Sequence, residues 1–276
     1  MTATITDRPP SIPPATAAKP GRAGPAATFR HAGALVWRGV IKTINSPEAL
    51  IDVTLQPVIF LLLFVYVFGG AISGDTGTYL QFALPGVLVQ TVVFASLGTG
   101  VALSEDLHTG IFDRFRSLPI SRSAPLIGAI GADLVRYLTS GVIMLAFGAL
   151  LGYRVGTDPL SVVAAFGLVM AFAFALCWVF TALAMVVTNP RSVQGISILV
   201  TMPLTFGSNV FVPAETMPSW LRVFVEVNPV SKTVDAVRGL LTGGPVAAPA
   251  TASLIAAGVI VAIFAPVAVA LYRRKT

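Results

Sequence analysis

The sequence contains little charge and almost no cysteine. Asp, Glu, Lys and Arg make up only 11% of the 276 residues, whereas hydrophobic residues make up 55%. This composition excludes an ordinary soluble domain. The single cysteine, Cys177, excludes an internal disulfide and a cysteine pair that could bind a metal. Because Cys177 lies within an apolar run, we expect it to be a small buried hydrophobic residue.

The common motifs for nucleotide hydrolysis and for nucleophilic catalysis are also missing. The chain has neither a G-x-x-x-x-G-K-[ST] phosphate loop nor a G-x-S-x-G elbow. The two histidines, His31 and His108, belong to different segments, which argues against a catalytic triad or a zinc site. We therefore expect that the chain is not an enzyme and that it holds no cofactor or metal of its own.

Acidic residues are missing from the middle of the apolar runs, where ion-coupled transporters usually carry an ionisable site. They fall instead at the ends of the runs or in the connections. Polarity within the runs is limited to a few uncharged side chains, namely Gln90, Thr91, Thr181 and Thr201. This pattern disfavours an ion-coupled transporter and indicates a channel-forming membrane protein that is driven by a separate energy source.

Six long apolar stretches dominate the chain. They cover approximately residues 50–71, 80–103, 134–152, 160–187, 193–212 and 254–272. A helix needs about 20 mostly apolar residues to cross the hydrocarbon core of a bilayer. The runs are continuous rather than alternating, so they predict helices and not the strands of a barrel. The sequence therefore predicts an all-α membrane protein with six transmembrane helices in one domain, residues 29–276.

The positions of Lys and Arg predict the orientation in the membrane. Residues 1–28 are rich in Pro, Ala and Thr, and they predict a disordered cytoplasmic tail without the apolar core of a signal peptide. With this tail inside, only four of the 18 Lys and Arg residues lie outside, namely Arg154, Arg222, Lys232 and Arg238. The positive-inside rule then places both termini in the cytoplasm and the chain in the cytoplasmic (inner) membrane. The net charge of +6 reflects this topology, and we expect no nucleic-acid partner.

Residues 29–45 predict a basic amphipathic helix. Trp37 lies at the edge of its apolar face, and Arg30, Arg38 and Lys42 gather near the opposite side. Such a helix suits the cytoplasmic surface of the membrane, where anionic lipids attract cations. Packing against the protein's own membrane helices is the alternative, and the two are compatible.

The cytoplasmic connection 104–123 predicts a short charged helix with a large apolar side. Ser104 can cap this helix, Glu105 and Asp106 then lie in its first turn, and Pro119 disfavours its continuation. Apolar residues recur on one side of it at helical spacing, namely Leu107, Ile111, Phe112, Phe115 and Leu118. Exposed Phe side chains are unfavourable without a partner, so we expect a cytoplasmic protein to dock here. Folding back onto the membrane helices is the alternative.

Two further helices are expected outside the six apolar runs. In the outer connection, residues 220–227 and 230–241 predict a pair of short helices, separated by Asn228-Pro229 and ended by Gly243-Gly244. Asp235 and Arg238 can form an i,i+3 ion pair in the second helix. We interpret the pair as a re-entrant or interfacial hairpin on the outer side. An ordinary loop lying on the membrane is the alternative.

Three stretches of the sequence resemble a known family. They are YLQFALPGVLVQ at 79–90, GIFDRFRSLPISR at 110–122 and SNVFVPAETMPSWLRVFVEVNPVSKTVDAVRGLLTGGP at 208–245. On these motifs the chain resembles the ABC-2 family of transport permeases, and most closely its daunorubicin-resistance type. The resemblance runs from about Phe29 to Arg274, and none of the three motifs departs from the family's pattern.

The resemblance implies a type V exporter with six transmembrane helices. Two permease copies, as a homodimer, would pair with two copies of a separate ATP-binding subunit that holds ATP and Mg. Residues 29–45 would be an interfacial helix, and residues 213–244, with Asn228, Pro229, Asp235 and Arg238, an extracellular helix pair. A coupling helix at 105–119 would bind the ATPase through ten residues, namely Glu105, Asp106, Gly110, Ile111, Phe112, Arg114, Phe115, Arg116, Leu118 and Pro119.

The resemblance also suggests the cargo. An apolar path with few polar groups suits an amphipathic drug or antibiotic that is exported from the cell. The same family contains exporters of lipid, glycolipid or polysaccharide, and such a cargo is the alternative. An ion-coupled transporter is less favoured.

The predicted docking side of the 104–123 connection can be tested directly. We expect Phe112→Ala, or charge reversal at Arg114, to abolish binding of the ATPase subunit, because either change removes a contact of the exposed apolar side. Membrane insertion is expected to be normal. Co-purification of the ATPase with tagged permease measures the effect, and unchanged co-purification would contradict the prediction.

Overall fold

The computed structural model describes residues 47–109, 124–187 and 189–275. Three of the predictions above fall outside these residues: the tail 1–28, the surface helix with Arg30, Trp37, Arg38 and Lys42, and the docking segment from Gly110 to Pro119. All regular structure in the described part of the chain is helical, as predicted. The long helices are α2 (Pro47–Leu63), α4 (Thr76–His108), α6 (Ala124–Leu150), α7 (Pro159–Val186), α8 (Pro190–Phe206) and α11 (Ala247–Lys275).

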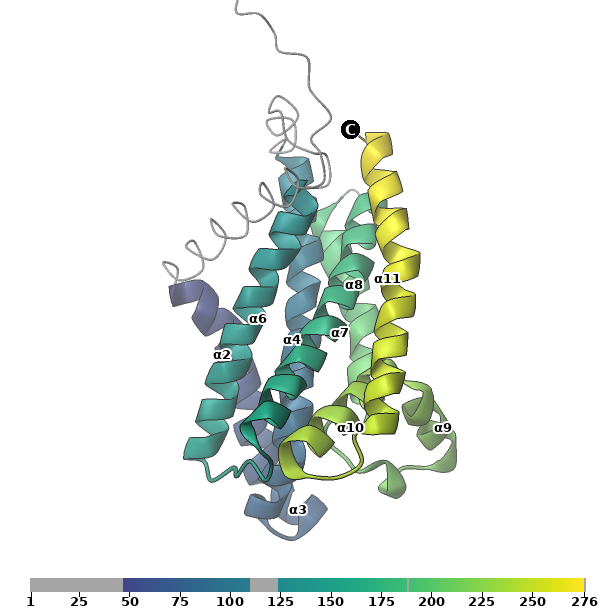
Figure 1. Cartoon of the computed structure of the whole chain (residues 1–276). Helices are drawn as coiled ribbons and strands as arrows, with labels where there is room; N and C mark the ends of the chain where they lie inside the picture. The colour runs from purple at the N-terminus through teal and green to yellow at the C-terminus, as the bar shows by residue number, and fades with distance from the viewer. Residues whose placement is uncertain (1–46, 110–123, 188, 276) are drawn as a thin grey trace, which may run out of the picture.

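Shorter elements join the long helices at one end of the bundle. Helix α2 continues through a π-helical turn, Phe64–Phe68, into α3 (Gly69–Ser73). A 3-10 turn, Ala214–Thr216, precedes α9 (Ser219–Val227) and α10 (Pro229–Thr242). Helices α3, α9 and α10 lie at one end, while the C-terminus lies at the other end, together with the end of α4 and the beginning of α6 (Figure 1). The predicted outer hairpin and the predicted docking segment therefore leave the bundle at opposite ends.

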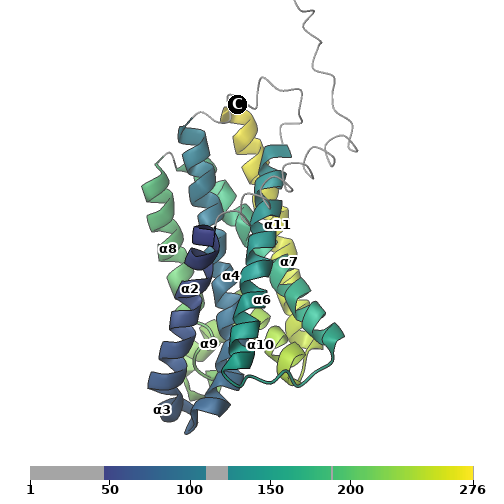
Figure 2. The same ribbon diagram turned by 90° about the vertical axis from the view of Figure 1, so that its left-hand side faces the viewer.

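Helix α4 is the centre of the bundle. It packs against α7 on one side and against α2, α6 and α8 on the others, and α10 closes over its first turns. Helix α11 packs against α7 and does not lie on the side of α2 (Figure 2). Of the apolar span of α4, 72% is buried within the chain, compared with 17% for α2 and 11% for α11. The outer helices thus leave apolar side chains exposed around a buried central helix.

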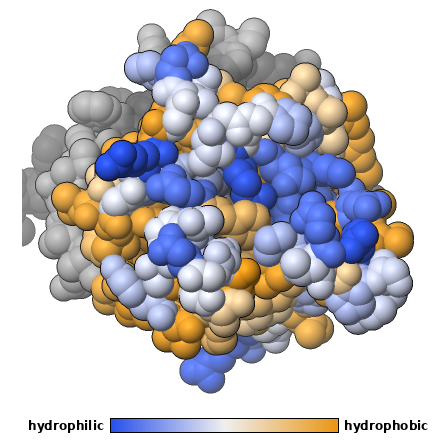
Figure 3. All heavy atoms as spheres, turned by 90° about the horizontal axis from the view of Figure 1, so that it is seen from below, coloured by the Kyte–Doolittle hydropathy of each residue, from blue (hydrophilic) through white to orange (hydrophobic). Residues whose placement is uncertain are grey.

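Within the residues that the structure describes, five helical segments are long and apolar enough to cross a membrane. They are Leu55–Ser73, Thr76–His108, Gly128–Leu150, Pro159–Val186 and Ala247–Tyr272. The end of the bundle that carries α3, α9 and α10 is polar in its middle and apolar around its rim (Figure 3). This distribution is the one expected when the end of a bundle faces water and its sides face lipid.

The fifth predicted run, 193–212, differs from the structure. Helix α8 ends at Phe206, and residues 207–212 form turns. Its 17 residues extend about 26 Å, somewhat less than a hydrocarbon core of about 30 Å. The helix ends here because the Asn228 side-chain amide donates to the carbonyl oxygens of Leu204 (2.7 Å) and Gly207 (3.0 Å), which replaces bonds that a longer helix would make. A count of six spans remains a prediction that requires α8 to cross the membrane.

The predicted helix start at Ser104 is wrong. Helix α4 continues without a break to His108, so Ser104 is a buried interior residue and Glu105 and Asp106 lie in the last turn of a helix. The reason is packing, since Leu103 belongs to an apolar cluster with Met185 of α7 and holds the helical backbone in register there. The Thr109 hydroxyl then donates to the Glu105 carbonyl oxygen (2.9 Å). The predicted restart of a helix after residue 121 is confirmed by α6, which begins at Ala124.

Carboxylates cap two of the spans. The Asp75 side chain accepts from the backbone N–H of Thr78 (2.7 Å) at the start of α4. The Asp158 side chain accepts from the hydroxyl of Ser161 (2.7 Å) and from backbone N–H groups at the start of α7. These hydrogen bonds favour the ionised form and lower the pKa of both carboxyls. Both carboxylates lie at exposed helix ends, where water can solvate the negative charge.

Two glycines allow other segments to approach α4 closely. A Cβ atom on Gly86 would lie 2.6 Å from the carbonyl oxygen of Val210, and one on Gly100 would lie 2.8 Å from the carbonyl oxygen of Phe180. Both neighbours are backbone atoms that cannot move away alone. Small residues at helix contacts are the usual means by which membrane helices pack in lipid. The contact between α4 and α7 therefore depends on Gly100.

The Gly100→Ala variant tests this packing. We expect it to lower the free energy of unfolding by about 1–3 kcal/mol, because the new methyl group forces α4 and α7 apart. The matched control is Gly167→Ala, since a Cβ atom at Gly167 of α7 would meet nothing within 4 Å. Thermal unfolding in detergent measures both variants. Equal midpoints for the two variants would contradict the packing role of Gly100.

Candidate functional site

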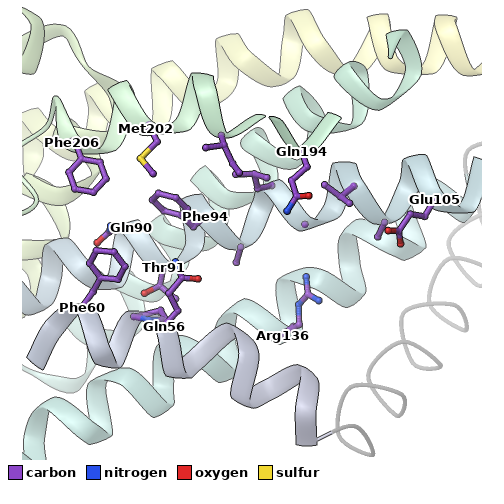
Figure 4. Close-up of a pocket in the computed structure, with 17 residues that line it drawn as sticks. Gln56, Phe60, Gln90, Thr91, Phe94, Glu105, Arg136, Gln194, Met202 and Phe206 are labelled. Carbon is purple, nitrogen blue, oxygen red and sulfur yellow. The ribbon is translucent and has the colours of Figure 1, made fainter. Parts of the chain in front are cut away.

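A cavity of about 540 Å³ opens between α2, α4, α6 and α8. Aromatic side chains line one end, and Figure 4 places Phe60 and Phe206 there. Glu105, in the last turn of α4, lies at the other end. Between them are three side-chain amides, Gln56, Gln90 and Gln194. Pockets of roughly 300–1,000 Å³ with apolar walls and a few polar groups are typical of small-molecule sites.

The cavity has an apolar end and a charged end. Gln90 and Glu105 are about four turns apart on α4, which is roughly 22 Å. Among the lining residues that the structure describes, the charges are those of Glu105 and Arg136, both toward the end at which α4 finishes. The opposite end carries Phe60, Phe94, Met202 and Phe206. The arrangement can accommodate a molecule with an apolar body and polar groups at one side.

Stacked aromatic rings close the apolar end of the cavity. The ring of Phe211, in the turn after α8, lies 3.9 Å from that of Phe64 and 5.8 Å from that of Phe206. Phe64 in turn stacks on Phe60 at 6.3 Å. Offset aromatic pairs at such distances stabilise a contact beyond the burial of area. The cluster joins the π-helical turn after α2 to the end of α8, next to the end of the cavity that Phe60 and Phe206 line.

An ion pair lies beside the cavity, inside the bundle. An Nη of Arg136 is 2.9 Å from a carboxylate oxygen of Asp133, and the Thr99 hydroxyl donates to the second oxygen at 2.6 Å. The Tyr137 hydroxyl lies 2.7 Å from Thr99 Oγ1 and donates to the Ala95 carbonyl oxygen at 3.0 Å. These contacts connect α6 to α4. In hydrocarbon, such a network supplies partners that water cannot.

Asp133 lies near the beginning of the third span, in keeping with the expectation that acidic residues avoid the middle of the runs, but it belongs to helix α6 and not to a connection. The third run was expected from residue 134, but α6 begins at Ala124 and its apolar span at Gly128, so Asp133 and Arg136 lie well inside the helix. Their i,i+3 spacing, with Tyr137 one residue further, puts them on one face, and that spacing was the available signal. Cys177 is fully buried as predicted, but its Sγ lies 3.5 Å from Thr99 Oγ1, so it borders this polar network.

The two predicted short helices of the outer connection are confirmed as α9 and α10. Asn228 separates them and caps α10, since its side-chain oxygen accepts from the backbone N–H of Val230 (2.9 Å). Gly243 and Gly244, both with positive φ, end α10. Whether the pair enters the membrane again stays a prediction.

The predicted ion pair in α10 also forms, with Arg238 and Asp235 at 3.3 Å. The Arg238 guanidinium donates to the carbonyl oxygens of Asn209 (3.0 Å) and Phe82 (3.3 Å) and lies 4.0 Å from the centre of the Phe82 ring. Burial raises the pKa of the Asp235 carboxyl and lowers that of the Arg238 guanidinium, while the attraction between the two groups opposes both shifts. Through these hydrogen bonds Arg238 links α10 to α4 and to the segment after α8.

The predicted site residues do not meet in one place. Asn228, Pro229, Asp235 and Arg238 lie in the outer hairpin, at the end of the bundle opposite to Glu105. Glu105 lines the cavity, a role that its sequence position did not indicate. Sequence reasoning missed the cavity as a whole, because its walls come from four helices. No group of three His, Cys, Asp or Glu side chains that could hold a metal ion occurs within 47–109, 124–187 and 189–275.

Comparison with known proteins identifies related sequences. Residues 30–242 match the family described as ABC-2 type transporter. The chain is 42% identical over 258 residues to the daunorubicin resistance ABC transporter permease protein DrrB1 of Streptomyces coeruleorubidus, which covers 93% of this chain and 90% of that protein. It is 30% identical over 237 residues to the probable doxorubicin resistance ABC transporter permease protein DrrC of Mycobacterium tuberculosis, covering 82% of each chain. A second protein from that organism, the doxorubicin resistance permease DrrB, is 28% identical over 260 residues, 88% of this chain and 90% of that protein.

Replacement of Arg238 tests how the outer hairpin is held. Only 18% of this side chain is exposed, and Arg238→Ala leaves the carbonyl oxygens of Phe82 and Asn209 without their donor. We expect the hairpin to be held less tightly by about 1–3 kcal/mol, the cost of leaving buried acceptors without a donor. Faster cleavage of the hairpin by a protease added to its side of sealed vesicles measures the effect. The matched control is Arg154→Ala, an exposed residue at the same end. Equal cleavage of the two variants would contradict the role of Arg238.

Proposed function

The chain belongs to the ABC-2 type transporter family, and on that premise we propose that it is the permease subunit of an ATP-driven exporter that moves an amphipathic drug or antibiotic across the cytoplasmic membrane. The relatives named above are daunorubicin and doxorubicin resistance permeases. The observation that carries the proposal is the cavity between α2, α4, α6 and α8, with aromatic rings at one end and charges at the other. An amphipathic molecule has the same division of apolar and polar surface.

The energy comes from a separate subunit. Two copies of an ATP-binding subunit bind ATP and Mg, and this chain contributes no catalytic residue. The coupling helix, residues 105–119, receives the force through its apolar side, with Phe112 and Phe115 as the main contacts. Its first residue, Glu105, lies both in the last turn of α4 and at the inner end of the cavity. A push on the coupling helix would therefore act directly on the central helix of the bundle.

Two permease copies form a homodimer around the transport path. Helices α2 and α8, which flank the cavity, leave large apolar side chains exposed, such as Leu55 and Ile59 on α2 and Leu199 on α8. A second copy would cover part of this surface and close the cavity from the side. ATP binding closes the two ATPases, brings the two copies together at the inner end and opens the path outward, because ATP binds the closed state more tightly.

The topology follows the positive-inside rule. Both termini lie in the cytoplasm, α8 is the fifth of six spans, and the α9–α10 hairpin lies at the outer surface as a re-entrant pair. Residues 29–45 lie on the inner surface, with Arg30, Arg38 and Lys42 toward anionic lipid and Trp37 at the edge of the apolar face. The termini can be located by labelling introduced cysteines from either side of sealed vesicles, using a Cys177→Ser background.

A lipid, glycolipid or polysaccharide cargo is the second candidate. The volume of about 540 Å³ favours a small molecule over a polymer. A single lipid would also fit the division into apolar and polar ends. Ion-coupled transport is disfavoured because Asp133, an acidic residue inside the described part of the bundle, is paired with Arg136.

Filling the cavity should stop transport without disturbing assembly. We expect Met202→Trp, in the cavity wall, to reduce ATP-dependent transport of an anthracycline into inverted vesicles at least about tenfold, because the larger ring occupies the space of the cargo. The control is Val259→Trp, at an exposed position of α11 away from the cavity. Co-purification of the ATPase subunit is expected to be normal in both variants. Normal transport by Met202→Trp, or transport driven by a proton gradient without ATP, would contradict the proposal.

A further inference from the structure

Arg136 lies on the wall of the cavity as well as in the ion pair with Asp133. Its guanidinium comes from α6 and points into the cavity, toward α4 and Gln194 (Figure 4). An Nη of the guanidinium pairs with Asp133 at 2.9 Å, the guanidinium carbon lies 5.5 Å from the centre of the Tyr137 ring, and the buried Nε has no hydrogen-bond partner. A guanidinium has five N–H donors in a rigid plane. Arg136 can therefore still donate hydrogen bonds to a molecule in the cavity.

The guanidinium is held in a fixed place. Asp133 receives a hydrogen bond from Thr99 of α4 at 2.6 Å, so the carboxylate that orients Arg136 is itself anchored. Gly98 of α4 has no side chain in front of the guanidinium, and a Cβ there would lie 3.8 Å from an Nη of Arg136. A donor that is oriented before the cargo arrives loses less freedom on binding. The Arg136 guanidinium is therefore oriented before a cargo molecule binds, as expected of a group that recognises a ligand.

The contact between α6 and α4 does not depend on Arg136 alone. The hydrogen bonds from Thr99 to Asp133 and from Tyr137 to Ala95 already join α6 to α4. A group that only served this contact would lie between the two helices. The side chain of Arg136 is instead 23% exposed, on the cavity wall.

From these observations we propose that Arg136 determines which cargo the cavity accepts, by donating hydrogen bonds to a carbonyl, phenolate or carboxylate oxygen on an apolar ring system. Because Asp133 compensates the charge, recognition depends on donors placed in a plane and does not require a fully anionic cargo. The rings of the cargo lie between Phe60, Phe94 and Phe206, and its oxygens face Arg136. This inference rests on the proposed function and adds a chemical class of cargo to it.

Two probes of similar shape separate this role from packing. The first is 1-hydroxyanthraquinone, which carries oxygen acceptors, and the second is 1-methylanthracene, which carries none. We expect Arg136→Gln to raise the KM for ATP-dependent transport of the first probe about tenfold to a hundredfold, the range for loss of a hydrogen bond from a charged donor. The KM for the second probe is expected to change less than about twofold, and kcat is expected to be unchanged for both.

A second variant alters the space around the guanidinium from the side of α4. Gly98→Leu places a side chain against the Arg136 nitrogen that pairs with Asp133, so it is expected to cover or displace the guanidinium and to weaken binding of the oxygen-bearing probe. Arg136→Lys, which keeps the charge but loses the planar donors, is expected to be intermediate. Equal effects on both probes, in either the Gln or the Leu variant, would mean that the residue acts through packing and would overturn the inference.

Equilibrium binding distinguishes failure of this inference from failure of the proposed function. Quenching of protein fluorescence gives the Kd of each probe for the purified permease without ATP. If the wild-type complex transports neither probe, the proposed function fails for this class of cargo, and the ratio of the two Kd values in wild type and Arg136→Gln still decides the inference. An unchanged ratio overturns it, and a ratio shifted toward the oxygen-free probe supports it.

Discussion

The absence of water inside a bilayer forces each polar group of a span to find its partner within the protein, and in this chain the partners gather around α4. The hydroxyls of Thr91 and Ser96 donate to carbonyl oxygens one turn earlier in the same helix, both at 2.7 Å. Thr99 instead bonds to Asp133 of α6. Because α4 is buried on most sides, these groups are shielded from lipid, and the apolar surfaces of α2 and α11 remain for contact with it. The same helix therefore organises the packing, the ion pair and the wall of the cavity.

Hydropathy predicted the helical class and located most spans, because a long apolar run has few alternatives in a membrane protein. Hydropathy gave the wrong helix ends where contacts between side chains determine where a helix begins or stops. Helix α8 stops at Phe206, where Asn228, a residue from another segment, takes the free carbonyl oxygens. Ser104 has the residue type of a helix cap, but tertiary contacts of Leu103 carry α4 through it. Asp133 was placed outside the third span because charge ends an apolar run, whereas the helix continues with its charges turned toward α4.

The candidate site was predictable only in part. Motifs in single segments identified the family, the outer hairpin and its Asp235–Arg238 pair, all of which depend on local spacing. The cavity depends on four helices that are far apart in sequence, so no local pattern locates it. The chemistry of the cavity wall nevertheless follows from general principles. The charge of Arg136 needs a paired carboxylate in lipid, which Asp133 supplies, and Gly98 leaves room for the guanidinium.

The side chain of Asn228 has a mechanical consequence. One amide holds the last carbonyl oxygens of α8 through its nitrogen and the first turn of α10 through its oxygen. Helix α8, which lines the cavity, and helix α10 are thereby linked by a single residue. If the outer end of α8 swings away from α4, it must carry α10 along or break three hydrogen bonds. Movement of α8 away from the cavity and movement of α10 are therefore coupled through Asn228.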